Sequence, residues 1–223
     1  MLRSLPCQWR IIGKRIPVPL RNYTESQFRL QSTVTITTQR SDARRNRELV
    51  LVAARKEFAK HGLDVGMDQI ARTAGVGVGT VYRHFPSKEQ LLGALADERF
   101  AGFAEAAGQA LENPDAWNGF CELLRHCARV VDEDRAISEA MDQHADLCHA
   151  SAEKTSLTEL AGRLIANAQA QGAMRPDFSV DDIPSLMRGL ARATAPQNDG
   201  PPAISWERYL EIMLAGLRAD ATR

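Results

Sequence analysis

Hydrophobic residues recur at helical spacing through most of the chain from about residue 43 onward. The first predicted helix runs from about Ala43 to His61, where Gly62 supplies the left-handed turn that ends it. Its apolar stripe consists of Val50, Leu51, Ala54 and Phe58. One hydrophobic face on a helix of this length predicts that the helix packs against further elements rather than standing alone.

Two short helices are predicted next, separated by a turn. The first spans about Met67 to Ala74 and is ended by Gly75, and the second spans Val78 to His84. In the second helix Val81 and Phe85 lie four residues apart, so they share one face and point inward. Two short helices joined by a glycine-containing turn are typical of a helix-turn-helix unit.

The outward face of the second short helix carries Thr80, Tyr82, Arg83 and His84. These side chains can donate hydrogen bonds to phosphates and base edges. Pro86 ends the helix, and Ser87 with Gln90 predicts a capping box for the next one, which places Lys88 in a helical first turn that favours anions. An ordinary helical hairpin is the alternative, but it does not explain why these hydrogen-bond donors lie together on one exposed face.

The rest of the chain also follows helical periodicity. A long helix is predicted from Ser87 to about Leu111, where Asn113 and Pro114 break it. Ser179 with Asp182, and later Ser205, mark the starts of two helices near the end of the chain. The other predicted helices span about 117–131, one or two short stretches within 133–150, and 157–171 before Gly172.

Composition and charge add two constraints. The 223 residues are 44% hydrophobic, which suits a small helical domain followed by a larger one, and no apolar run reaches the roughly 20 residues that a membrane span needs. Four cysteines at irregular spacing do not form a disulfide framework, which favours a reducing cytoplasm. Residues 1–92 hold sixteen basic and seven acidic residues, whereas residues 93–223 hold twelve basic and twenty-one acidic ones. This asymmetry predicts that nucleic acid binds the N-terminal part.

Residues 1–40 lack helical periodicity and contain three prolines and a threonine-rich patch. They are predicted to be a disordered basic leader. Two interpretations stay open: an arm that reaches along the DNA backbone, together with Arg44, Arg45 and Arg47, or an unstructured leader that follows a start codon placed too early. An arginine-rich leader can also imitate a transit peptide.

Three segments together resemble the DNA-binding domain of the TetR family of repressors. They are VLVAARKEFAKHG at 50–62, MDQIARTA at 67–74 and GVGVGTVYRHFPSKEQLL at 75–92. The resemblance implies an all-α fold, with a helix-turn-helix domain at 41–92 and a helical regulatory and dimerisation domain at 93–223. It also implies that the matching core positions are Ala54, Phe58, Ile70, Val81, Phe85 and Leu91, and that the DNA-contacting residues are Val78, Gly79, Thr80, Tyr82, Arg83, His84 and Lys88.

The same resemblance implies a homodimer and an inducer pocket. The dimer interface would involve Leu186, Leu190, Tyr209, Met213 and Leu217, whose alternative role is packing within the chain. The pocket would lie among the central helices, with candidate lining residues Phe103, Trp117, Cys121, His126, Met141, His144 and Met187. The chain departs from the family at Gly66 and Gly77, where a serine or threonine usually caps each short helix.

The resulting prediction is a sequence-specific DNA-binding transcriptional regulator, a ligand-responsive cytoplasmic repressor that binds a palindromic operator as a homodimer. Its partners would be double-stranded DNA and an unidentified small-molecule effector, with no cofactor and no membrane. A metal- or thiol-responsive regulator using His144 and Cys148, with Asp142 and His149 nearby, is an alternative. A helical protein-interaction adaptor is a remoter one, and no enzyme motif was found.

Overall fold

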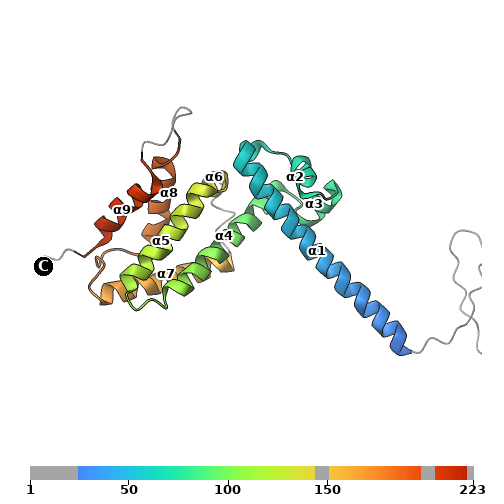
Figure 1. The fold of residues 1–223 in the computed structure, drawn as a ribbon, viewed down its shortest axis with the longest axis horizontal. Coiled ribbons are helices and arrows are strands. Elements are labelled where there is room, and N and C mark those ends of the chain that lie inside the picture. Colours follow the sequence, from blue (N-terminus) through green and yellow to red (C-terminus); the bar gives the residue numbers. More distant parts are fainter. Residues whose placement is uncertain (1–24, 144–150, 197–203, 220–223) are drawn as a thin grey trace, which may run out of the picture. The chain divides into compact units, whose positions relative to one another are not determined.

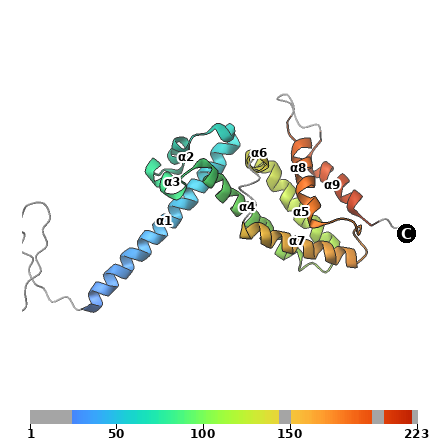
Figure 2. The same cartoon turned by 180° about the vertical axis from the view of Figure 1, so that it is seen from behind.

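The computed structural model describes residues 25–143, 151–196 and 204–219, and side chains are described for 41–141, 151–196 and 204–219. The described chain is helical, apart from turns and an isolated antiparallel bridge between Met174 and Arg218 (Figures 1 and 2). The α-helices are α1 Glu25–His61, α2 Met67–Ala74, α3 Val78–His84, α4 Lys88–Ala110, α5 Ala116–Glu133, α6 Arg135–Gln143, α7 Ala152–Ala170, α8 Ile183–Ala193 and α9 Trp206–Leu217. The predicted all-α class is confirmed.

Helix α1 begins at Glu25 rather than near Ala43. The expectation of irregular backbone is therefore wrong for residues 25–40, while residues 1–24 lie outside the described part. Extending an existing helix adds one hydrogen bond for each residue fixed, so a helix can continue without an apolar stripe of its own. Residues 1–44 and 45–223 form two separate units, and the buried clusters lie in the second.

Side-chain caps fix where several helices begin, as the sequence predicted at Ser87, Ser179 and Ser205. The Ser87 hydroxyl accepts a hydrogen bond from the Gln90 amide at 3.3 Å, and the Ser205 hydroxyl accepts one from the Arg208 amide at 3.3 Å. Ser179 and Asp182 form a reciprocal capping box. Each such cap satisfies amides that a helix leaves unpaired and contributes about 1 kcal/mol.

The buried residues form two clusters. The first joins α1, α2, α3 and the start of α4, and it contains all six core positions that the family resemblance implied. Helix α6 also contributes Ile137 and Ala140 to this cluster. The second cluster joins α4, α5, α7, α8 and α9. Burial of each large apolar side chain in these clusters contributes about 1.5–3 kcal/mol.

Helix α4 belongs to both clusters. Leu91 and Leu95 are buried in the first, and Phe103 and Ala107 are buried in the second. The end of α4 lies close to α5, because Gly119 has no side chain there and a Cβ atom would lie 2.5 Å from the Ala110 carbonyl oxygen. No described helix is long and apolar enough to cross a membrane.

Candidate nucleic-acid interface

The turn between α2 and α3 is built by Gly75, which has φ 67°. Its amide donates to the Arg72 carbonyl at 3.2 Å, and the Val76 amide donates to the Ala71 carbonyl at 3.1 Å. This pairing is a Schellman motif, which needs the left-handed conformation that glycine adopts without strain. Gly66 and Gly77 are the N-cap residues of α2 and α3 and have extended backbone without a side-chain cap.

Helix α3 presents a mixed polar face. Val81 and Phe85 are buried, as predicted, and they hold α3 against the first core. Tyr82 is 47% exposed and Val78 is 40% exposed, while Arg83 and Gly79 are also exposed. Thr80 is half-buried. The outward orientation predicted for Tyr82 and Arg83 therefore matches the structure, and their contact with DNA stays a prediction.

His84 lies partly inside, which corrects the expectation that it faces fully outward. It is half-buried, and its Nε2 atom is buried without a hydrogen-bond partner among the described residues. Burial, followed by the positive charges of Arg83 and Arg47, lowers the pKa of the imidazole. The neutral form is thus favoured in the free protein.

Lys88 makes contacts within the protein that the sequence did not predict. Its ammonium donates to the backbone carbonyl of Leu63 and lies 5.6 Å from the centre of the Phe58 ring. The side chain therefore ties the start of α4 to the loop after α1. One donated hydrogen bond leaves two ammonium hydrogens, so a phosphate contact remains compatible with this position.

The three arginines predicted to support DNA binding, Arg44, Arg45 and Arg47, are all exposed near the middle of α1. Arg47 lies over the ring of Phe85, with its guanidinium carbon 5.3 Å from the ring centre. This cation–π contact orients a positive charge beside the end of α3. The position is suitable for a phosphate contact next to the exposed face of α3.

A buried polar contact that the sequence did not predict joins α1 to α2. Thr73 donates to Glu57 Oε1 at 2.7 Å, and Glu57 is only 6% exposed. This hydrogen bond is the main reason that the pKa of Glu57 is lowered. It holds α2 against α1.

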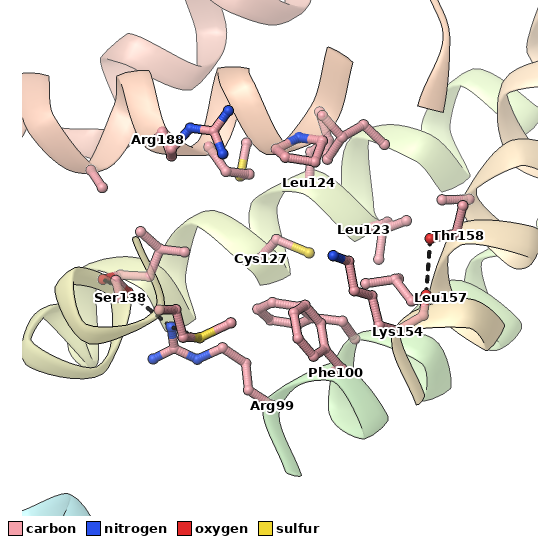
Figure 3. A pocket seen from close by; sticks show the side chains of 18 of the residues that line it. Arg99, Phe100, Leu123, Leu124, Cys127, Ser138, Lys154, Leu157, Thr158 and Arg188 are labelled. Carbon is pink, nitrogen blue, oxygen red and sulfur yellow. Dashed lines mark hydrogen bonds between the residues drawn. The ribbon is translucent and has the colours of Figure 1, made fainter. Parts of the chain in front are cut away.

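A cavity of about 510 Å³ lies among α4, α5, α6, α7 and α8 (Figure 3). Three of the predicted pocket residues line it, namely Phe103, Met141 and Met187. Trp117, Cys121 and His126 do not line it, which corrects those expectations. Trp117 instead packs under Arg218, Cys121 is buried in the second core, and the ring of His126 meets Phe103 edge-on.

The polar lining residues of this cavity, above all Arg99 and Lys154, were not predicted from the sequence. Arg99 interrupts an otherwise apolar face of α4, and that interruption was the available signal. Its side chain is 4% exposed, and it donates to Ser138 Oγ at 2.9 Å and to the Asp134 carbonyl at 3.1 Å. The Asp134 carboxylate lies 3.5 Å from the same guanidinium.

Asp134 connects this lining residue to α1. Its carboxylate lies 3.7 Å from the Arg55 guanidinium, and Arg55 also pairs with Glu98 at 3.0 Å. A chain of ionic contacts thus leads from the cavity wall to the helix that supports α2 and α3. Its members come from α1, α4 and the end of α5.

The predicted dimer residues divide into two groups. Leu190 and Leu217 are buried within the chain, at 0% and 7% exposure, so their alternative role in the chain's own core is the one observed. Leu186, Tyr209 and Met213 are half-buried on α8 and α9, and Ile212 on α9 is 54% exposed. These half-buried and exposed side chains leave apolar surface on the two helices.

The alternative of a metal or thiol site rests on residues that the structure does not describe. His144, Cys148 and His149 lie outside the described residues, as does the side chain of Asp142. Among the described side chains no cluster of histidine, cysteine and acidic residues could hold a metal ion. Burial raises the pKa of the Cys127 thiol to about 12 and also raises that of Cys121, which disfavours the reactive thiolate at both described cysteines.

Comparison with known proteins agrees with this geometry. Residues 50–95 match the model of bacterial regulatory proteins of the TetR family, and residues 115–219 match that of the SbtR-like transcriptional regulator C-terminal domain. An HTH-type transcriptional regulator of Staphylococcus aureus is 41% identical over 64 residues, which are 27% of this chain and about a third (33%) of that relative.

Solved structures extend the similarity to most of the chain. A TetR regulatory protein from Mycobacterium vanbaalenii is 34% identical, with 81% of this chain and 99% of that chain covered at a TM-score of 0.57. RolR in complex with resorcinol is 23% identical, with 81% and 91% covered at a TM-score of 0.55, and shows the shared fold. This chain belongs to the TetR family of helix-turn-helix transcriptional regulators.

Proposed function

We propose that this regulator is a repressor that binds a palindromic operator as a homodimer and releases it when a small molecule occupies the cavity. The observation that carries the DNA-binding role is the exposed face of α3, where Tyr82 and Arg83 project from a helix anchored by Val81 and Phe85. A helix held in this way can enter a major groove without refolding. Thr80, Val78 and Gly79 flank the same face and would read the operator with it.

Phosphate contacts would come from basic residues on α1 and α4. Arg44, Arg45 and Arg47 are exposed on α1, and Lys88 stands at the first turn of α4. Such contacts position the protein on the duplex and make binding dependent on salt. His84 has a smaller role in this proposal, since its Nε2 atom is buried.

Homodimer formation is supported by the apolar surface of α8 and α9. Leu186, Tyr209 and Met213 are only partly covered within the chain, and Ile212 is exposed beside them. A twofold pair of subunits is also what two half-sites one helical turn apart require. Leu190 and Leu217 would support this surface from beneath.

The response to a ligand is supported by where the cavity lies. It is lined by α4 and α6, and both helices also pack in the core of the DNA-binding unit. Movement of either helix on ligand binding would change the position of α3. A ligand can do this only if it binds one arrangement more tightly than the other, and the contact of Arg99 with Asp134 is one that an occupant could alter.

Selection of bound duplexes from a random pool by the purified chain tests this function. We expect enrichment of a palindrome with half-sites about one helical turn apart. Enrichment of a single half-site would contradict the homodimer, and no enrichment would contradict sequence-specific binding. Crosslinking the protein to DNA in living cells, followed by sequencing of the bound fragments, tests whether the chain reaches the same operator in the cytoplasm.

A further inference from the structure

The walls of the cavity are mainly apolar, as Figure 3 shows. Phe100 and Phe103 come from α4, Leu123 and Leu124 come from α5, and Met187 comes from α8. A cavity of about 510 Å³ is large enough for a small organic molecule. The lining therefore favours a ligand with an apolar body.

The charged side chains at the cavity are unbalanced. Arg99, Lys154, Arg188 and Arg192 line it, and the only acidic lining residue that the structure describes is Glu139. Arg188, Arg192 and Glu139 are exposed, whereas Arg99 is buried and Lys154 is half-buried. Positive charge beside an apolar wall attracts an anion more strongly than the same charge in water. The electrostatics therefore favour a ligand with a negative group.

Arg99 and Lys154, the least exposed of these four cations, differ in their hydrogen-bond and ion-pair partners. Arg99 is held by Asp134 and Ser138. Lys154, on the first turn of α7, is half-buried, and its nitrogen points into the cavity toward Cys127 (Figure 3). The described residues form no ion pair or hydrogen bond with this ammonium. A partly buried ammonium without a counter-ion is unfavourable, and an anion in the cavity would relieve it.

The neighbouring thiol does not supply that charge. Burial raises the pKa of Cys127 to about 12, so its sulfur is neutral at physiological pH. No described residue supplies a counter-ion for Lys154, and an anion in the cavity would provide one.

We propose that the effector of this regulator is an apolar organic acid whose carboxylate pairs with Lys154 and whose body lies between Phe100, Phe103 and Met187. This inference rests on the proposed ligand response and names the chemical class of the ligand. A charge-assisted hydrogen bond of this kind is stronger than one to a neutral hydroxyl.

Calorimetric titration of the purified chain with 4-phenylbutyrate, 4-phenylbutanol and 4-phenylbutylamine tests the proposal without DNA. We expect the acid to bind about ten-fold more tightly than the alcohol and the amine to bind most weakly. Equal binding of acid and alcohol, or no binding of any of the three, would overturn the proposal. Because these comparisons use the unaltered protein, they do not depend on how a variant folds.

Lys154→Met then tests the anchor, with Lys56→Met on the exposed surface of α1 as the matched control. Lys154→Met should abolish the preference for the acid and leave alcohol binding unchanged, while Lys56→Met should keep the preference. A preference that survives in Lys154→Met would exclude Lys154 as the anchor. If the acid binds but never releases operator DNA, the proposed ligand response is contradicted and the ligand class is not. If only neutral ligands release the DNA, the proposed ligand class is contradicted and the ligand response is not.

Discussion

The carboxylate of Asp134 lies 3.5 Å from the guanidinium of Arg99, whose side chain is 4% exposed. This pair joins the end of α5 to the middle of α4 at the wall of the cavity. A buried guanidinium keeps its charge at all accessible pH values, so it depends on this carboxylate and on the oxygens of Ser138 and the Asp134 backbone.

Asp134→Asn should therefore lower the free energy of unfolding by about 3 kcal/mol, because it removes the negative charge that lies 3.5 Å from this buried guanidinium. Urea denaturation followed by circular dichroism measures the change. Glu211→Gln removes the exposed pair of Glu211 with Arg208 and should cost less than about 1 kcal/mol. Equal effects of the two substitutions would show that Arg99 is solvated in solution.

The close approach of α4 and α5 gives a second prediction. A Cβ at position 119 would lie 2.5 Å from the Ala110 carbonyl oxygen, a backbone atom that cannot rotate away. Gly119→Ala should destabilise the protein by about 1–3 kcal/mol through overpacking. Gly162→Ala in α7, where nothing lies within 4 Å, should instead be neutral or stabilise by about 0.5–1 kcal/mol. Thermal denaturation of both variants distinguishes steric exclusion from helix propensity.

The helix-turn-helix unit could be predicted from the sequence because its signals are local. Gly75, Pro86 and Ser87 each mark a boundary through backbone geometry or a cap, and these do not depend on distant residues. The inward positions Val81 and Phe85 follow from helical spacing alone. The same reasoning failed for the start of α1, because continuation of a helix needs no periodic apolar signal.

The cavity could be predicted only in part because it depends on how five helices meet. Apolar candidates such as Phe103 and Met187 were found, but Trp117 has the same character and packs elsewhere. Arg99 and Lys154 look like ordinary charged helix residues until α4 and α7 are placed side by side. The hydrogen bond of Lys88 to Leu63 could not be predicted for the same reason, since this partner is set by tertiary packing.

Lys88→Met gives a third prediction, with two separate readouts. Methionine keeps an unbranched side chain over Phe58 but loses the hydrogen bond to the Leu63 carbonyl, so the free energy of unfolding should fall by about 1.5–3 kcal/mol. If the ammonium also contacts a phosphate, the salt dependence of operator binding should flatten by about one unit of slope per subunit. Lys60→Met, at an exposed position of α1, should leave stability unchanged. A normal salt slope in Lys88→Met would restrict Lys88 to a structural role.

The half-buried imidazole of His84 predicts a dependence of stability on pH. Its pKa is lowered in the folded protein, chiefly by burial, whereas the unfolded chain has a value of about 6.5. As the pH falls below the pKa of the unfolded chain, the imidazole is protonated in the unfolded state before it is protonated in the folded state. The free energy of unfolding therefore decreases until the pH passes the pKa of the folded protein. His84→Gln cannot titrate and should remove this part of the loss. Urea midpoints between pH 8 and pH 5 that change in parallel for both proteins would contradict the prediction.

Tyr82 provides the most direct test of the interface, since it is 47% exposed on α3 and its loss should not disturb the core. Tyr82→Ala should weaken binding to the selected operator by about ten-fold, which corresponds to about 1.4 kcal/mol, the scale of a hydrogen bond or a base contact. Unfolding free energy and the oligomeric state should remain unchanged. Asn167→Ala, at an exposed position of α7, should alter none of these quantities. Fluorescence anisotropy with labelled operator measures the affinity. Unchanged affinity in Tyr82→Ala would exclude Tyr82 from the contacts with DNA, because no other exposed aromatic side chain is described on the helix to take its place.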